Sequence, residues 1–231
     1  MKSYLSTLKE KPYVTYILIL INTLVLLYMG WLDIVGQSSD LVIDQGGVFR
    51  YFVITFNQWY RLLTAGFIHL SLEHFLFNML AVYFVGIELE YLLGHGPYLF
   101  VYLMSLLGGS VFSLALSDPY TLSVGASTAV FGLFAAYIML SQLYPQSAYL
   151  GTRARNYALL IGLNLVMNLF STDIDMWGHI GGAIGGILST GVVGIAGLSL
   201  KSRWKQGLTW FVVLMFYGMI CVFIALNRSQ Y

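Results

Sequence analysis

A serine hydroxyl at the start of an apolar run is the first group in this sequence that could do covalent chemistry. Ser127 lies in the stretch 125–132, where small residues surround it before the apolar run continues. Serine in a membrane helix usually bonds to its own backbone or packs at a helix contact, so Ser127 alone does not indicate catalysis. A nucleophilic serine needs a base that takes its proton and donors for the negative charge that develops after attack.

Two histidine-containing segments could supply those partners. His179 stands at the start of a glycine-rich apolar run, whereas His69, His74 and Asn78 lie near the start of another. His74 and Asn78 are four residues apart and share a helix face, which suits two donors of an oxyanion hole. His69 lies nearly opposite Asn78, so we expect it to make a structural bond with the preceding loop.

Glycines around His179 favour close approach between its helix and another. Gly178, Gly182 and Gly186 recur every fourth residue, a spacing typical of a seam between membrane helices. Such a seam would bring the imidazole of His179 within reach of Ser127. Ordinary helix packing explains the same seam without chemistry, and a histidine bonded to a loop carbonyl is the corresponding alternative for His179.

The composition indicates that these residues belong to a membrane protein. Of 231 residues, 58% are hydrophobic and 9% are charged, and the mean hydropathy is +0.78. Such a chain is too apolar to fold as a soluble globule around one core. The net charge of +1, with basic residues spread over several segments, gives no reason to expect a nucleic-acid partner. The single cysteine, Cys221, excludes an internal disulfide, and we expect it to be packed or lipid-facing.

Hydropathy predicts an all-α integral membrane protein, a bundle of about seven transmembrane helices. The apolar runs are of the length needed to cross about 30 Å of hydrocarbon as helix. The expected spans are 13–32, 68–92, 98–116, 127–143, 156–170, 179–200 and 208–226. The first run is too long for a signal-peptide core and lacks a clear cleavage site, so we expect it to be retained. The segment 33–61 mixes aspartates with aromatic residues, which predicts a long loop in the headgroup zone.

No linker or shift in composition marks a second domain. We expect a cytoplasmic tail at 1–12, a six-span catalytic core at 13–200, and a seventh span with a C-terminal tail at 201–231. Basic residues fall in alternate segments, which places the N-terminus and two loops on the cytoplasmic side of the cell membrane. These residues are Lys2, Lys9, Lys11, Arg153, Arg155, Lys201, Arg203 and Lys205.

This topology brings the candidate groups to one side of the membrane. The second, fourth and sixth spans all run from outside to inside, and each has candidate residues near its beginning. The predicted site is therefore extracytoplasmic and shallow, where water can reach it. Unrelated polar residues scattered through seven spans would rarely all lie near the same side of the membrane.

The same residues give the chain its resemblance to a known family. From about residue 59 to 186 it resembles bacterial rhomboid intramembrane serine proteases, of the type with a six-span core and a C-terminal seventh span. The resemblance rests on several spaced elements rather than on one motif. They are Arg61, His69, His74 with Asn78, Glu90 and Gly94, the signature Gly125-x-Ser127-x-x-x-Phe131-Gly132, and His179 with Gly182 and Gly186.

The resemblance implies a role for each of these residues. Ser127 would be the nucleophile and His179 the general base, with no third acidic member. Asn78, His74 and the backbone N–H of Ser127 would form the oxyanion hole, and Phe131, one turn after the serine, would stack on the base. Supporting positions would be His69, Gly125, Gly182, Gly186, Arg61 and Glu90. No metal or cofactor is implied.

The implied substrates are single-span membrane proteins, cut near the extracytoplasmic end of the transmembrane helix. A peptide bond in such a helix is shielded by its own hydrogen bonds, so attack requires local unwinding. Asn164 and Asn168 make the short fifth span our candidate for the helix that yields to admit substrate. Inward-facing asparagines that tie helices together are an equal alternative. Neither the substrate's identity nor the oligomeric state follows from the sequence.

Two departures and three competing interpretations accompany this resemblance. Thr128 follows the serine where many rhomboids carry glycine, and Ala65 stands where some carry a further histidine. A transporter or channel would place polar groups at mid-depth, with broken helices. A metalloprotein using His69, His74 and His179 would be expected to show a spacing such as His-Glu-x-x-His, which the sequence lacks. An inactive rhomboid-like module that binds membrane proteins is the third alternative, although this chain retains both serine and histidine.

Overall fold

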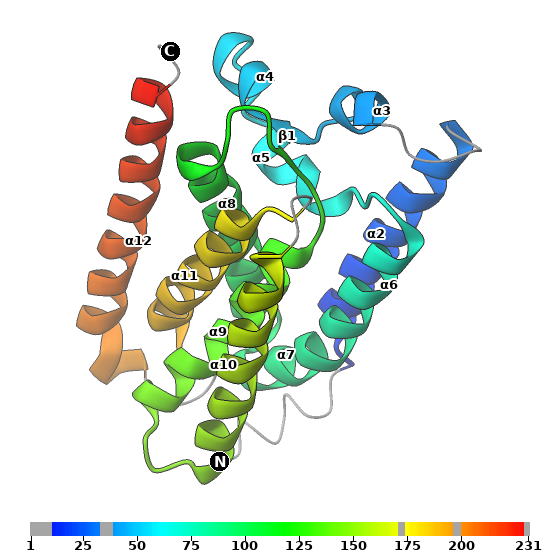
Figure 1. Cartoon of the computed structure of the whole chain (residues 1–231). Coiled ribbons are helices and arrows are strands. Elements are labelled where there is room, and N and C mark those ends of the chain that lie inside the picture. Colours follow the sequence, from blue (N-terminus) through cyan, green and yellow to red (C-terminus); the bar gives the residue numbers. More distant parts are fainter. Residues whose placement is uncertain (1–10, 33–38, 171–173, 196–199, 229–231) are drawn as a thin grey trace.

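The chain folds into a bundle of helices (Figure 1). A computed structural model describes residues 11–32, 39–170, 174–195 and 200–228. The expected all-helical fold class is confirmed, with one two-stranded sheet added to it. Lys2 and Lys9 of the predicted cytoplasmic tail lie outside the described residues.

Long helices alternate with short ones along the chain. The first half contains α2 (Tyr13–Leu32), α3 (Ser39–Asp44), β1 (Val48–Phe49), α4 (Arg50–Thr55), α5 (Arg61–Thr64), a 3-10 turn (Ala65–Phe67), α6 (Leu72–Ala81), a π-helical turn (Val82–Gly86) and α7 (Ile87–Leu93). The second half contains α8 (His95–Leu116), β2 (Leu122–Ser123), α9 (Ser127–Leu143), α10 (Ala148–Asn168), α11 (Met176–Val193) and α12 (Leu200–Arg228). The expected loop at 33–61 therefore includes short helices and a strand in its described part.

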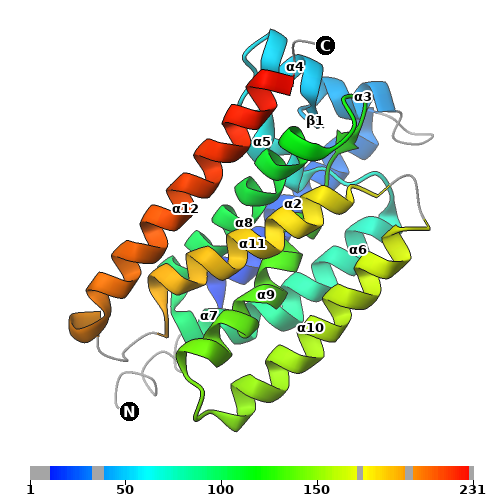
Figure 2. The same ribbon diagram turned by 60° about the vertical axis from the view of Figure 1, so that its left-hand side comes forward.

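Several helices have the length and composition of membrane spans. Within the described residues, Tyr13–Gly30, Leu72–Leu93, His95–Leu116 and Trp204–Arg228 are long and apolar enough to cross a bilayer. The helix α9 is apolar but shorter, and α10 and α11 lie in the same bundle at the places of the expected fifth and sixth spans (Figure 2). The protein is thus a multi-pass membrane protein, whereas the count of seven spans stays a prediction.

The direction of the helices brings several starting points to one end of the bundle. The helices α6, α9 and α11 all begin toward the end where α3, α4 and α5 lie, the upper end in Figure 1. The connection between α9 and α10 lies at the opposite end. Residues at the beginnings of α6, α9 and α11 can therefore meet, although more than a hundred positions separate the first of these helices from the last.

The fifth span begins earlier than the sequence indicated. The helix α10 starts at Ala148 rather than at 156, because the Ser147 hydroxyl accepts a hydrogen bond from the Leu150 N–H and caps the helix there. In the added turns, the Arg153 guanidinium donates to the Glu88 carboxylate at 2.6 Å. Hydropathy marks where charged residues interrupt the apolar run, whereas capping decides where the helix begins.

The sixth span is displaced toward the N-terminus from the expected 179–200. A side-chain oxygen of Asp175 accepts from the Gly178 N–H at 3.0 Å, so the helix α11 begins at Met176. It ends before Gly194, whose φ of +61° interrupts the helix in a conformation that glycine adopts easily. His179 consequently lies in the first turn of α11 instead of at its first residue.

The glycines of α11 bring it into close contact with α9. A Cβ atom on Gly182 would lie 2.1 Å from the carbonyl oxygen of Thr128, and one on Gly186 would lie 2.2 Å from that of Gly132. Real Cβ atoms do not approach other atoms so closely, so both positions require glycine at this helix separation. This is the seam that the sequence predicted, and its partner helix is the one that begins with Ser127.

A second glycine seam, which the sequence analysis did not identify, joins α11 to α8. A Cβ atom on Gly181 would lie 2.8 Å from the Gly108 carbonyl oxygen, and one on Gly185 would lie 2.6 Å from that of Met104. The helix α11 is therefore packed closely on two sides, against α9 and α8. Its first turn, which carries His179, has little freedom to shift.

Candidate active site

Ser127 is the first residue of α9, directly after a tight backbone turn. Gly125 has a φ of +106°, a conformation that residues with a side chain rarely adopt. A Cβ atom there would also lie 2.5 Å from Cε1 of His74, so the imidazole of His74 lies against this turn. The strand β2, which pairs antiparallel with β1, leads into the turn. The sheet and the turn at Gly125 thus fix the position of Ser127 at the start of α9.

The structure brings Ser127 and His179 into hydrogen-bond contact. The Ser127 Oγ atom lies 2.9 Å from Nε2 of His179, and the histidine is 9% exposed. The two residues are in the first turns of α9 and α11, the helices that the Gly182 and Gly186 seam holds together. The contact has the geometry required of a nucleophile and its general base.

Phe131 lies beside the same imidazole, as the one-turn spacing from Ser127 indicated. Its ring stacks on that of His179 with centroids 4.2 Å apart and an angle of 10° between the planes. Phe131 is itself buried in the core of the bundle. A fixed phenyl ring of this kind restricts the tilt of the imidazole that faces it.

The other ring nitrogen of His179 has a partner that the sequence analysis had not assigned to the site. The side-chain nitrogen of Asn168 lies 2.9 Å from Nδ1 of His179. Asn168 is the last residue of α10 and is buried. The sequence signal was an asparagine near the end of a short apolar run, but nothing in that pattern indicates which helix the amide faces.

Asp175 is a second residue whose contribution to the site the sequence analysis missed. One of its carboxylate oxygens, Oδ1, accepts from the Gly178 N–H at 3.0 Å and from the Ser117 hydroxyl at 2.9 Å. It therefore starts α11 and ties that start to the end of α8. An aspartate three residues before Gly178 is a recognisable N-cap signal, and it places His179 in the first helical turn.

His69 and His74 lie side by side, with ring centroids 5.0 Å apart. Nε2 of His69 accepts a hydrogen bond from the backbone N–H of Ala126 at 3.4 Å. His69 therefore connects the loop before α6 to the residue that precedes Ser127. The backbone N–H of His74 donates to the Ser71 hydroxyl, which caps α6. Both histidines therefore lie in the surroundings of Ser127. The ring of His69 is bonded to the backbone of Ala126, and the ring of His74 lies against Gly125.

Asn78 is buried on α6, and its side-chain amide donates to the carbonyl oxygen of His74 at 2.9 Å. This bond within the helix occupies one of two N–H groups of the amide. The second N–H is the one that could donate to a substrate oxygen. The structure thus leaves the role assigned to Asn78 by resemblance as a prediction.

Arg61 holds the segment between α3 and α5 against the bundle. Its guanidinium donates to the carbonyl oxygens of Ile43 and Gly47 and to the side chain of Gln58, and it lies over the ring of Phe52. These contacts connect the short helices to the segment that contains β1. Arg61 therefore fixes the segment that leads into β1, the strand that pairs with β2.

Glu90 acts at the opposite end of the second span. Its carboxylate accepts from the backbone N–H groups of Val14 and Thr15 and from the Thr15 hydroxyl, and it contacts Nδ1 of His95. The first N–H groups of a helix have no partner within it, so Glu90 caps the N-terminus of α2. These contacts are structural, and Glu90 lies at the other end of the second span from His74 and Asn78.

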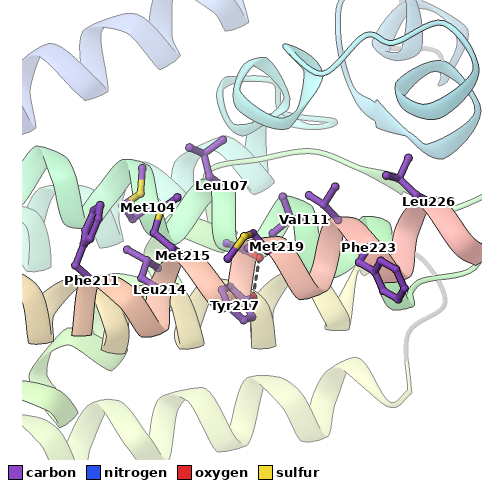
Figure 3. Close-up of a pocket in the computed structure, with 13 residues that line it drawn as sticks. Met104, Leu107, Val111, Phe211, Leu214, Met215, Tyr217, Met219, Phe223 and Leu226 are labelled. Atoms are coloured by element: carbon purple, nitrogen blue, oxygen red, sulfur yellow. Dashed lines mark hydrogen bonds between the residues drawn. The ribbon is translucent and has the colours of Figure 1, made fainter. Parts of the chain in front are cut away.

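An apolar groove of about 530 Å³ lies between α8 and α12, and none of the predicted site residues lines it (Figure 3). Tyr217 contributes to its wall, and the Tyr217 hydroxyl lies 2.8 Å from the Gly108 carbonyl oxygen and 3.2 Å from that of Gly181. The helix α12 is thereby bonded to α8 and to the helix of His179.

Within the described residues, no group of three or more histidine, cysteine or acidic side chains is arranged to hold a metal ion.

Comparison with known proteins gives the family. The rhomboid-domain family model matches residues 56–196, more than half of the chain. The rhomboid protease GluP of Bacillus subtilis is 35% identical over 188 residues, which are 80% of this chain and 36% of GluP. RHOMBOID-like protein 2 of Arabidopsis thaliana is 36% identical over 153 residues, which are 65% of this chain and 47% of that protein. YdcA, another Bacillus subtilis relative, is 29% identical over 178 residues, or 77% of this chain and 86% of YdcA.

The match with GluP covers most of this chain, but this chain spans only 36% of GluP's length. The matched family segment contains α6, α9 and α11, the helices that carry Asn78, Ser127 and His179. The sequence resemblance is therefore confirmed at the level of the family. This chain belongs to the rhomboid family.

Proposed function

We propose that the chain is a serine endopeptidase that cleaves single-span membrane proteins through a dyad of Ser127 and His179. The observation that carries the proposal is the 2.9 Å contact between Ser127 Oγ and His179 Nε2. Membership of a family that includes rhomboid proteases supports an intramembrane protease function. The proposal requires no cofactor and no metal ion.

The proposed reaction has two halves, and each half uses one proton transfer to His179 and one from it. His179 Nε2 takes the hydroxyl proton as Ser127 Oγ attacks the carbonyl carbon of the scissile bond. The imidazolium then gives that proton to the leaving amine as the peptide C–N bond breaks, which leaves an acyl group on Ser127. A water molecule gives a proton to the same nitrogen and attacks the acyl group, and the imidazolium returns that proton to Ser127 Oγ as the bond from Oγ to the acyl carbon breaks and the carboxylate product leaves.

The proposed oxyanion hole combines the start of α9 with two groups of α6. The backbone N–H of Ser127 belongs to the first turn of α9, whose N–H groups have no partner within the helix and carry the positive end of its dipole. Asn78 and His74 would add side-chain donors from α6. His74 lies against Gly125, two residues before the serine, which supports its part in this arrangement.

We further propose that the site opens on the extracytoplasmic side of the cell membrane, with the N-terminus in the cytoplasm. Ser127 and His179 lie in the first turns of their helices, so the site is near one end of the bundle. A substrate would then present its outer helix end, with a small residue such as alanine before the cut and glycine or proline just after it. Helix-weakening residues are needed there because a regular helix shields its own peptide bonds.

The decisive experiment is a cleavage assay with purified protein in liposomes and a panel of single-span substrates, analysed by mass spectrometry. Ser127→Ala and His179→Ala should each abolish cleavage while the protein still accumulates and inserts, because the members of a dyad act as a unit. Full activity in either variant would contradict the proposal. Activity lost to a chelator and restored by a metal ion would favour a metal-dependent protein instead.

The depth of the cut tests the substrate model separately. Replacing the glycine or proline downstream of the mapped bond by leucine should slow cleavage at that bond, since leucine stabilises the helix that must unwind. A leucine replacement in the same helix, several turns away from the mapped bond, serves as the control. Unchanged cleavage at the same bond would mean that local unwinding does not govern selection.

A further inference from the structure

Both ring nitrogens of His179 have polar partners, and these come from different helices. Ser127 Oγ, on α9, lies 2.9 Å from Nε2, and the side-chain nitrogen of Asn168, on α10, lies 2.9 Å from Nδ1. Asn168 is 7% exposed and is the last residue of its helix. The imidazole is therefore held between the start of one helix and the end of another.

The two polar contacts restrain a motion that stacking leaves open. Phe131 lies parallel to the imidazole of His179, which fixes the plane of the ring. A half-turn of the ring about its bond to Cβ keeps that plane but exchanges nitrogen and carbon positions. Such a half-turn would break the contact with Ser127 and the contact with Asn168 together. Asn168 therefore opposes the one rearrangement that Phe131 permits.

The tautomer of His179 depends on what faces Nδ1. A neutral imidazole has one N–H and one lone pair, so a base that accepts at Nε2 must carry its hydrogen on Nδ1. In the structure the amide nitrogen of Asn168 faces Nδ1, which suits a hydrogen on Nε2. A half-turn of the amide puts its oxygen in the same place, where it accepts from the Nδ1 hydrogen and leaves Nε2 free to act as base.

We propose that Asn168 is a positioning residue for His179, with its amide oxygen holding the hydrogen on Nδ1 during catalysis. This inference rests on the proposed function. When the Ser127 proton moves to Nε2, both nitrogens carry hydrogen and the ring becomes positive. The bond from Nδ1 to the Asn168 oxygen then persists and stabilises the imidazolium, as a neutral counterpart of the carboxylate in other serine proteases.

The position of Asn168 makes the orientation of the base depend on α10. This helix packs mainly along α9, where Tyr157 stacks on Phe134 with centroids 5.1 Å apart. Its hydrogen bond to the catalytic histidine is made by its last residue, Asn168. A displacement of that end of α10 would remove the contact at Nδ1 without moving Ser127.

The same helix provides a matched control. Asn164 lies one turn earlier on α10, is exposed, and donates its amide to the carbonyl oxygen of Leu160 in its own helix at 2.9 Å. It has the same chemistry as Asn168 but a different partner. Of the two asparagines noted in the sequence, one therefore ties helices together and the other does not.

The test compares Asn168→Leu, Asn168→Asp and Asn164→Leu with the unmodified protein. The rate at which a fluorophosphonate labels Ser127, and kcat and KM on a cleaved substrate, are measured for each. Asn168→Leu should lower the labelling rate and kcat by about 10- to 100-fold, the range for losing the group that orients a metal-bound histidine, with little change in KM. Asn168→Asp should restore most of the rate because its carboxylate accepts from Nδ1. Asn164→Leu should match the unmodified protein.

A spectroscopic measurement decides the matter even if Asn168→Leu fails to fold. Nitrogen-15 spectra of histidine-labelled protein, with His179→Gln to assign the signals, should show hydrogen on Nδ1 of His179 once a phosphonate occupies Ser127. They should also show that Asn168→Asp retains this pattern. Hydrogen on Nε2 alone in that state, or an Asn168→Leu protein as fast as the unmodified one, would overturn the inference and leave the dyad intact. Failure of the unmodified protein to react at Ser127 would instead contradict the proposed function.

Discussion

Hydrogen-bond capacity sets what each polar side chain of the site can contribute. Asn78 and Asn227 show the same local pattern, because each amide donates to a carbonyl oxygen four residues earlier in its helix. Asn78 is buried on α6, the helix that also carries His74, whereas Asn227 is exposed near the end of α12. The two asparagines therefore differ in their surroundings and not in how their amides are held.

Replacing Asn78 by alanine should lower kcat by about 10²- to 10³-fold, the usual loss when one oxyanion donor is removed. The protein should still accumulate, because Asn78 bonds only within its own helix among the contacts described. Cleavage rates of purified protein in liposomes measure the effect, with Asn227→Ala as the control of matched chemistry. An undiminished rate would move the oxyanion role to another group.

At the scale of elements, the separation of α9 and α11 decides whether the dyad forms. Gly182→Ala should lower activity strongly and destabilise the fold by about 1–3 kcal/mol, the range expected for overpacking, because the new Cβ atom would clash with the backbone of α9 at Thr128. Gly162→Ala is the control, since a Cβ atom at Gly162 meets nothing within 4 Å. Cleavage rate and thermal unfolding of both variants are compared. A Gly182→Ala protein that is fully active and stable would refute the packing argument.

The last helix, α12, is bonded to the core by the hydroxyl of Tyr217 and, near its end, by the guanidinium of Arg228, which donates to the carbonyl oxygen of Ala115 at 2.6 Å. Tyr217→Phe removes the contacts to the carbonyl oxygens of Gly108 and Gly181 but keeps the ring that contributes to the groove wall in Figure 3. The expected loss of stability is about 0.5–1.5 kcal/mol, the net worth of a buried hydrogen bond. Thermal unfolding in detergent measures it, with the exposed Tyr120→Phe as the control. Equal unfolding temperatures would mean that the Tyr217 hydroxyl does not contribute to holding α12 on the core.

At the scale of the whole molecule, orientation in the membrane is testable without any substrate. Tyr120 is 83% exposed in the connection after α8, at the end of the bundle where Ser127 lies. Gln146 is exposed in the connection between α9 and α10, at the other end. In a Cys221→Ala background, Tyr120→Cys should react with an impermeant maleimide on intact cells and Gln146→Cys only after lysis. The reverse pattern would overturn the predicted topology.

Hydropathy and short-range spacing determined the membrane class of this protein, its helices and one of its close helix contacts. The apolar runs indicated the membrane class and the helices, and the glycines around His179 indicated a close helix contact. The predicted topology placed Ser127 and His179 on one side of the membrane, the family resemblance paired them, and the one-turn spacing placed Phe131 near Ser127. Hydropathy, the glycine spacing and the position of Phe131 depend on neighbours within one or two turns of a helix, so the local sequence determines them.

Only the tertiary structure decided which atoms meet. The pairing of Ser127 Oγ with Nε2 and of Asn168 with Nδ1, and the second glycine seam at Gly181, depend on how helices far apart in the chain are rotated about their axes. The start of α10 depended on a capping serine and a paired arginine rather than on hydropathy. Local sequence carries the periodicity of a helix, but rotation, separation and side-chain rotamers are set by contacts among all the helices at once, because packing in the bundle has to be satisfied everywhere together.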